Sequence, residues 1–217
     1  MVTAVNIEEL CSRVHQAIRC RPLYEFPAAD KGVPKNGIYF LFEKGETGHA
    51  GRRIVRVGSH TGQRNLAHRL VEHTTANKDR SIFRKNIGRA LLNRDKDPFL
   101  KQWNWDLTKR DDRERFAPLL DKARQNAVEE SVTAWIVDRL SYTCISVDDQ
   151  EERLALEKAL IATVAQCEAC TSSAGWLGRH SPVESIGLSG LWLKQHLRGI
   201  LLSDQQIIRL ETICGRS

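Results

Sequence analysis

Two short apolar runs in the first third of the chain constrain the fold most. Residues 38–42 (IYFLF) and 54–57 (IVRV) are rich in aromatic and β-branched side chains, and the polar, glycine-bearing segment KGETGHAGRR separates them. This pattern predicts an antiparallel β-hairpin with a long tip. Residues 142–147 (YTCISV) predict one further strand. We therefore expect a small, mostly antiparallel three-stranded sheet.

Helical spacing of apolar residues marks most of the remaining chain. Asn6 with Glu9, and Ser203 with Gln206, form capping-box patterns, and Ser81 can cap a further helix. The expected helices lie at residues 7–19, 65–74, after 81, 129–140 and 150–166, and around LWLKQHL and DQQIIRLETIC. The predicted class is α/β (α+β): a central sheet flanked by helices, with helical N- and C-terminal additions.

The chain is long enough for one moderately large domain, because it has 217 residues of which 41% are apolar. We expect an N-terminal helix and connection over residues 1–35, a main domain over 36–180 with a charged insertion at about 95–127, and a helical extension over 181–217 packed on that domain. Neither a membrane-spanning stretch nor a secretion signal is evident, so the expected protein is soluble and cytoplasmic.

The cysteines do not resemble a disulfide framework. All six, at positions 11, 20, 144, 167, 170 and 214, are scattered along the chain, so reduced thiols are expected. Cys167 and Cys170 form a single CxxC that could be half of a zinc site. No second CxxC or paired-histidine motif completes it, so the sequence favours no structural zinc.

Positive charge is concentrated in one segment. Residues 51–94 hold eleven Lys and Arg against two acidic residues, a balance of +9, so the rest of the chain carries −3 of the +6 total. A concentrated positive field in a soluble protein is typical of nucleic-acid binding. From charge alone, an ordinary solvated surface is equally compatible.

A carboxylate lies on the apolar face of the helix expected at 150–166. Glu157 is flanked at helical spacing by Leu154, Leu160 and Ile161. Because burying an unpaired carboxylate is costly, it either forms an ion pair with an arginine or borders a cleft where it binds a cation. On the helix at 65–74, Arg69 and His73 are four residues apart and share one face, which also fits an exposed basic pair.

In combination these features resemble the GIY-YIG nuclease superfamily. Gly37-Ile38-Tyr39 matches the first motif literally, and Arg56-Val57-Gly58 occupies the place of the second. NLAHRL resembles the helix that carries an arginine, here Arg69, and LALEKALI resembles the helix that carries a metal-binding glutamate, here Glu157. His73 is similar to a histidine of the restriction-enzyme members.

The resemblance implies a metal-dependent DNA endonuclease, plausibly a restriction or defence enzyme. Tyr39 would accept or relay the proton of the attacking water, and Arg69 would hold the scissile phosphate. Glu157 would ligate Mg²⁺ or Mn²⁺. His73 and His60 would support phosphate contact or proton relay.

Duplex DNA is the expected partner, with a homodimer possible if both strands of a palindrome are cut. The exposed side of the helix after Ser81 is expected to present basic residues to the DNA. The expected DNA-contacting residues are Arg56, Arg64, Arg84, Lys85, Arg89 and Ser173. Trp103 and Trp105 could stack on bases, although buried packing is the commoner use of tryptophan.

The sequence departs from the superfamily pattern at two positions. Arg56 stands where the second motif has tyrosine, and the asparagine expected after the glutamate helix is missing, although Ser172 or Ser173 could substitute. These departures favour an alternative, a non-catalytic nucleic-acid-binding module on a degenerate nuclease scaffold. A third reading is an interaction protein that docks through LWLKQHLRGILL, although packing of that segment on its own domain is more common.

Overall fold

The computed structural model describes residues 6–28 and 32–215. At its centre is a sheet in the order β1-β4-β2-β3, in which every neighbouring pair is antiparallel. The strands are β1 (Tyr24–Glu25), β2 (Gly37–Gly48), β3 (Gly51–Gly58) and β4 (Leu140–Ser146). The predicted α/β class is confirmed. The described sheet has four strands instead of three, because the two-residue β1 pairs with β4 along the edge that β2 leaves free.

The β2–β3 hairpin is longer than the sequence predicts. Its strands continue through the polar segment to a tight turn at His49 and Ala50, which have φ angles of 48° and 57°. Polar residues can extend the hairpin because Arg53 and Glu46 form a buried ion pair, with 2.5 Å between Nη2 and Oε2. The expected long, irregular tip is therefore wrong.

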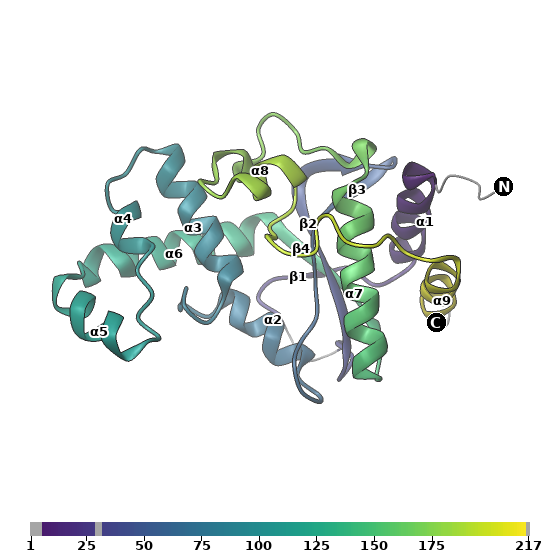
Figure 1. Ribbon diagram of the computed structural model, residues 1–217, viewed down its shortest axis with the longest axis horizontal. Helices are drawn as coiled ribbons and strands as arrows, with labels where there is room; N and C mark the ends of the chain where they lie inside the picture. The colour runs from purple at the N-terminus through teal and green to yellow at the C-terminus, as the bar shows by residue number, and fades with distance from the viewer. Residues whose placement is uncertain (1–5, 29–31, 216–217) are drawn as a thin grey trace.

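Helices cover both faces of the sheet, so that β2 is buried on both sides. On one face, Ile38 and Phe40 pack with apolar residues of α1 (Ile7–Arg19), α7 (Gln150–Ala165) and α9 (Asp204–Gly215). On the other face, Tyr39 and Leu41 pack with α2 (Leu66–Thr74), α3 (Ile82–Arg94) and α6 (Lys122–Arg139). Figure 1 shows α7, α1 and α9 on one side of the strands and α2, α3 and α6 on the other.

The expected helix starts agree with the observed caps. The side chain of Asn6 accepts hydrogen bonds from the amides of Glu8 and Glu9, and Ser81 caps α3. Asp149 caps α7 in the same way. Short polar side chains satisfy the free amides of a first helical turn, which is why these starts can be predicted from sequence.

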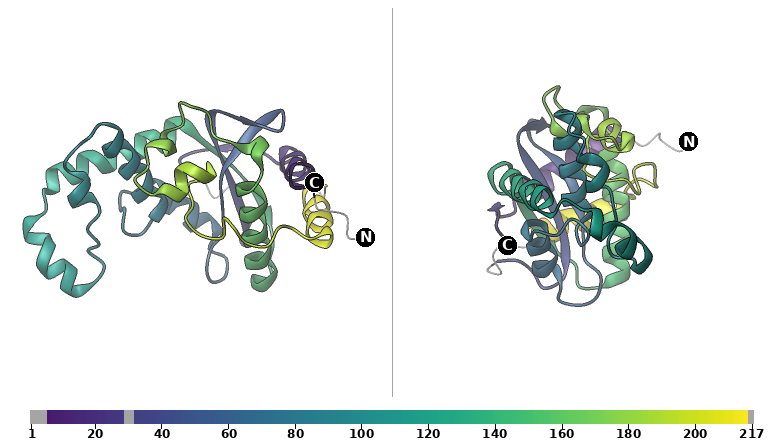
Figure 2. Two further views of the ribbon diagram at one scale, coloured as in Figure 1. Left: turned by 45° about the horizontal axis from the view of Figure 1, so that its top comes forward. Right: turned by 90° about the vertical axis from the view of Figure 1, so that its left-hand side faces the viewer.

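The segment expected to be an irregular insertion is largely helical. It contains α4 (Leu100–Trp103), α5 (Arg110–Phe116), the 3₁₀ turn η1 (Ala117–Leu119) and the beginning of α6, and it extends away from the sheet (Figure 2). Trp103 is fully buried against α3, where its indole N–H donates to the Lys85 carbonyl at 2.9 Å. Its burial favours the packing role over base stacking.

The chain after α7 returns to the sheet. It forms η2 (Glu168–Cys170), η3 (Leu177–His180), α8 (Glu184–Ser189) and α9, whose Ser203–Gln206 capping box is present. The helix expected around LWLKQHL is wrong. Leu191 and Trp192 are instead both fully buried, and the Trp192 amide donates to the Val55 carbonyl of β3 at 2.8 Å. Within the described residues, no helix is both long and apolar enough to cross a membrane.

Candidate active site

Two glycines bring the ends of β2 and β3 into close contact. Tyr39 of β2 pairs with Gly58 of β3, and a Cβ at Gly58 would lie 2.4 Å from the Tyr39 Oη. At the start of β2, a Cβ on Gly37 would lie 2.0 Å from the Ile145 carbonyl oxygen. Both motif glycines are therefore required because other atoms occupy the space of a side chain.

The Tyr39 phenol lies in a polar network below the surface. Its oxygen is 2.8 Å from His73 Nε2 and accepts a hydrogen bond from Arg56 Nε at 3.2 Å. Among the described residues, His73 Nε2 is the acceptor within reach of the phenol's own hydrogen, so we assign Tyr39 as the donor to His73. Arg56 also donates to the Trp192 carbonyl at 2.6 Å, which ties this network to the C-terminal segment.

His73 is neutral in this environment. It is fully buried, and burial, followed by the charges of Arg56, Arg69 and Arg84, lowers its pKa well below the ordinary value. With Nε2 accepting from Tyr39, the ring proton is on Nδ1, which donates to Ser81 Oγ at 3.1 Å. The imidazole is thus a proton acceptor for the phenol.

Arg69 lies beside the same phenol and keeps part of its surface. Its side chain is 22% exposed, and Nη1 donates to Glu72 Oε2 at 2.7 Å. Burial disfavours the charged form, but the neighbouring Tyr39 oxygen and the Glu72 carboxylate raise the pKa of Arg69 above its usual value. Arg69 is therefore a permanent, partly accessible cation next to Tyr39.

Glu157 reaches the same end of the sheet from α7. Its carboxylate accepts from the Ser59 amide at 3.1 Å and from Ser59 Oγ at 2.5 Å, and Ser59 directly follows Gly58. It is half-buried, and it forms no ion pair with any residue in the described part of the chain. The sequence left two alternatives for Glu157, an ion pair with an arginine or a position where it could bind a cation. The ion pair with an arginine is not observed.

His60 supports the beginning of β2. Its Nε2 accepts a hydrogen bond from the Gly37 amide at 3.3 Å, and its Nδ1 is buried without a hydrogen-bond partner among the described residues. Burial and the charge of Arg153 lower its pKa. A neutral His60 therefore connects the glycine of the first motif to the loop that holds Glu157.

The family model described as the GIY-YIG domain matches residues 6–210. The chain belongs to the GIY-YIG family. No curated protein and no solved structure matches it significantly. GIY-YIG proteins are endonucleases that depend on a metal ion and act on DNA, which supports a nuclease-type function in general for this chain.

The GIY-YIG match extends beyond the residues that carry the motifs. It includes α1 at one end and much of α9 at the other. These two helices pack on each other and on the face of the sheet that α7 covers. In this protein they are part of the core around the glutamate helix.

The predicted exposure of two basic residues on α3 is wrong. Arg84 is fully buried and pairs with Glu129 at 2.6 Å, and Lys85 is 6% exposed and pairs with Asp79 at 3.1 Å. The low amphipathicity of α3 explains the error, because α6 and the inserted segment cover the side that the sequence leaves polar.

The other four residues expected to contact DNA differ in their surroundings. Arg56 is 5% exposed and belongs to the Tyr39 network, so it does not form part of an open basic surface. Ser173 bonds to Glu46 through both its amide and its hydroxyl. Arg89 is half-buried and donates to Asn86 and Asn104. Of the three arginines in this set, only Arg64 is exposed, and it forms no ion pair with any residue that the structure describes.

Sequence reasoning missed three groups of this site. Ser59 holds Glu157, Glu72 holds Arg69, and Ser81 orients His73 in addition to capping α3. Ser59 could have been suspected because it follows the glycine of the second motif. The other two contacts depend on how α2 and α3 pack, which local sequence patterns do not determine.

Proposed function

We propose that the protein is a metal-dependent DNA endonuclease that hydrolyses phosphodiester bonds. The observation that supports this most is that the paired ends of β2 and β3 contact all three groups proposed for the reaction. Tyr39 pairs with Gly58, Ser59 next to it holds Glu157, and Arg69 lies beside the phenol. A phenol, a guanidinium and a carboxylate are the groups that such a reaction needs for proton transfer, phosphate binding and metal binding.

Glu157 fits a hard divalent cation. Its carboxylate is half-buried and its donors are the neutral Ser59 amide and hydroxyl, so its charge is not cancelled. Mg²⁺ is commonly bound by one or two carboxylates together with water and substrate phosphate. A bound Mg²⁺ or Mn²⁺ would compensate the charge on the phosphate and on the leaving oxygen.

Tyr39 and His73 form the proposed route for the proton of the attacking water. The phenol oxygen accepts that proton while its own hydrogen moves to His73 Nε2, which is 2.8 Å away and unprotonated. The neighbouring arginines disfavour an imidazolium in the free protein. Negative charge on a bound phosphate reduces this penalty, so the proton acceptor becomes effective only when substrate is present.

Arg69 is the proposed phosphate ligand. It is held by Glu72, and a phosphate competes with that carboxylate for the same guanidinium donors. Tyr39 is fully buried, so movement of Arg69 toward the phosphate also opens the way to the phenol. Arg64, exposed on the loop before α2, is the proposed contact to the flanking DNA backbone.

Duplex DNA is the proposed substrate, and restriction or defence the proposed role. The position of His73, one turn after Arg69 and bonded to Tyr39, supports this class of nuclease through its similarity to the restriction-enzyme members. Cutting both strands of a symmetric site would require two copies of the chain, so a homodimer on DNA belongs to the same proposal.

A second function is favoured by a specific observation. Arg56 stands in place of the second motif's tyrosine and donates to Tyr39, so one phenol is missing and the other is engaged inside the protein. A non-catalytic DNA-binding module would retain salt-sensitive binding through exposed cations. It would hydrolyse nothing with any divalent metal.

The test is a cleavage assay on duplex, branched and single-stranded DNA with Mg²⁺, Mn²⁺ or chelator. We expect metal-dependent cutting of duplex DNA, reduced about 10²–10³-fold by Arg69→Ala, as for loss of one charge-stabilising donor. Arg94→Ala is the matched control, because Arg94 is an exposed cation paired only with its neighbour Asp95. Salt-sensitive binding without cleavage under every metal would reject the enzyme and select the binding module.

A further inference from the structure

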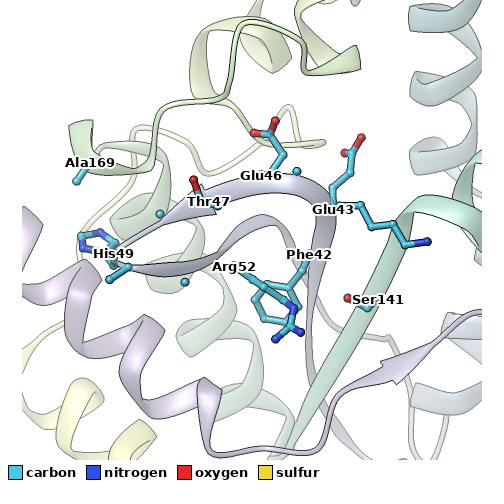
Figure 3. Close-up of a pocket in the computed structure, with 13 residues that line it drawn as sticks. Phe42, Glu43, Glu46, Thr47, His49, Arg52, Ser141 and Ala169 are labelled. Carbon is cyan, nitrogen blue, oxygen red and sulfur yellow. The ribbon is translucent and has the colours of Figure 1, made fainter.

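Four metal-binding side chains meet at the end of the hairpin remote from Tyr39. Cys11 and His15 lie one turn apart on α1, His49 lies at the β2–β3 turn, and Cys170 lies in η2 after α7. Their ligand atoms all lie within 4.8 Å of one another. The His15 and His49 rings have centroids 4.8 Å apart, and Figure 3 shows His49 at the tip beside α1.

Two separations within the cluster match a tetrahedral zinc site. The Cys11 and Cys170 sulfurs are 3.5 Å apart, and His15 Nε2 is 3.7 Å from Cys170 Sγ. Zinc bonds of about 2.3 Å to sulfur and about 2.0 Å to nitrogen place tetrahedral ligands about 3.3–3.8 Å from each other. The sulfurs are too far apart for a disulfide, in which they lie about 2.05 Å apart.

We propose that Cys11, His15, His49 and Cys170 bind one structural Zn²⁺ ion. Two thiolates and two neutral imidazoles give a Cys₂His₂ set whose charge cancels that of the ion, as a buried site requires. Three of the four residues are buried and His49 is half-buried. Four protein ligands complete a tetrahedral shell, so no coordination position is left for a substrate.

Both histidines have partners that orient a zinc ligand. His15 Nδ1 is 2.9 Å from the Cys11 carbonyl oxygen and donates to it, so Nε2 is the nitrogen that can ligate a metal. The Ile54 amide donates a long hydrogen bond of 3.5 Å to Nε2, and zinc would take its place. His49 Nε2 is 3.3 Å from Cys167 Sγ, which leaves Nδ1 for the metal. Ligating histidines usually donate their second ring N–H in this way.

The two thiols already contact each other. The Cys11 and Cys170 sulfurs lie 3.5 Å apart in a hydrogen bond that either thiol can donate. Zinc binding would replace the proton of that bond with a cation that both sulfurs can ligate.

The backbone of the hairpin tip is shaped around His49. His49 and Ala50 both have left-handed backbone angles, in a two-residue turn where Asn-Gly is the usual pair. Such conformations are costly for residues other than glycine and require compensation. Arg19 donates to the His49 carbonyl, and a Cβ at Gly51 would collide with the Arg19 guanidinium. The turn thus holds His49 toward α1.

The zinc site joins three segments that are far apart in sequence. It connects α1 and the hairpin tip to the end of α7, the helix that carries Glu157. Tyr39 and His49 are separated along β2 by roughly 30 Å at the rise of an extended strand. The ion is therefore separate from the proposed Glu157 metal, and its role is to stabilise the domain.

The test measures zinc in the full-length protein, purified without chelator from zinc-supplemented cells. We expect about one Zn²⁺ per chain by elemental analysis, and Co²⁺ substitution giving the visible absorption of a tetrahedral thiolate site. Cys11→Ser and Cys170→Ser lose the metal, while Cys144→Ser, a buried cysteine of β4 outside the cluster, retains it. Cys167→Ser retains zinc but binds it about 10–100-fold more weakly.

His49→Asn removes one ligand while keeping the fold, because asparagine tolerates the left-handed backbone angles of this turn. It is expected to fold and to lose zinc. Zinc-free wild-type protein after supplementation, zinc retained by both cysteine-to-serine ligand variants, or a Cys11–Cys170 disulfide found by mass spectrometry would each overturn the proposal. Glu157→Gln is expected to keep its zinc, so failure of the nuclease proposal leaves this one separately testable.

Discussion

Tyr39 and His73 share a hydrogen bond whose direction depends on a neutral imidazole. Arg56 donates to the phenol, the phenol donates to His73, and His73 donates to Ser81. Protonation of the His73 imidazole would place a hydrogen on Nε2, which could then no longer accept the hydrogen bond from Tyr39. This makes the network sensitive to acid.

The acid sensitivity of this network should appear as a pH dependence of the free energy of unfolding. The pKa of His73 is well below the ordinary value in the folded protein, so below about pH 6.5 the unfolded chain binds a proton that the folded chain does not. Stability is therefore highest above pH 6.5 and falls with acid by about 1.4 kcal/mol per pH unit for this group, until the folded-state pKa is reached.

Urea unfolding between pH 7 and pH 5 measures this slope. His73→Asn is expected to lower stability by about 1–3 kcal/mol at pH 7, because the buried Tyr39 hydroxyl loses the acceptor for its hydrogen, and to make the slope shallower by about one proton. His68→Asn on the same helix is the control, since the His68 side chain is 64% exposed. Equal slopes for wild type and His73→Asn would show that His73 titrates normally.

At the scale of elements, α3 and α4 make contact through a glycine. A Cβ at Gly88 would lie 2.3 Å from the Trp103 ring, which is fully buried there. The inserted segment therefore docks on α3 through close approach of an indole to the helix backbone. This contact also explains why the segment is ordered although few of its residues are apolar.

Gly88→Ala tests this contact. In an exposed helix the change would stabilise by about 1 kcal/mol, because alanine is the better helix former. Here we expect destabilisation of about 1–3 kcal/mol from overpacking against Trp103. Chemical denaturation measures it, and Gly88→Ala/Trp103→Leu is the control, which should recover part of the loss. A more stable Gly88→Ala protein would contradict the docking.

Local signals predicted the elements that carry the site, and packing decided the rest. The hairpin and the helices capped by Asn6, Ser81 and Asp149 follow from residue pattern. The LWLKQHL segment has helical spacing, yet Trp192 pairs with β3 instead. The conformation of this segment depends on how the Trp192 side chain packs in the folded domain, which the spacing of apolar residues does not reveal.

The same distinction applies to the candidate sites. Tyr39, Arg69, His73 and Glu157 were proposed because motif order is visible in sequence. In the structure His73 and Arg69 lie beside the Tyr39 phenol. Glu157 is bonded to Ser59, next to the glycine that pairs with Tyr39. The cluster around Cys170 was not predicted, because its second half is a cysteine and a histidine one turn apart on the first helix, about 160 positions away. Only the packing of α1 against the hairpin unites the two halves.

At the scale of the whole molecule, part of the positive charge is internal. Five of the eleven cations in residues 51–94 are buried: Arg53, Arg56, Lys78, Arg84 and Lys85. These buried cations form ion pairs or belong to the hydrogen-bond network of Tyr39. DNA binding is therefore expected to depend on fewer cations than the net charge of the segment suggests.

The salt dependence of DNA affinity measures these contacts. Arg64→Ala is expected to reduce the slope of log K against log salt by about 0.9, the value for one phosphate contact on duplex DNA. Arg110→Ala is the control, because Arg110 is also exposed but lies on α5 in the segment that extends from the sheet. An unchanged slope for Arg64→Ala would remove Arg64 from the DNA interface.

The most direct test of the nuclease compares Glu157→Gln with Glu151→Gln in single-turnover cleavage of duplex DNA with Mg²⁺. Both changes remove one carboxylate charge from α7, but Glu157 is held by Ser59 beside the paired ends of β2 and β3, whereas Glu151 is exposed in the first turn of the helix. We predict that Glu157→Gln cuts about 100-fold more slowly or worse, with unchanged melting temperature and DNA affinity. Glu151→Gln should cut like wild type, and undiminished cleavage by a folded Glu157→Gln protein would contradict the proposed mechanism.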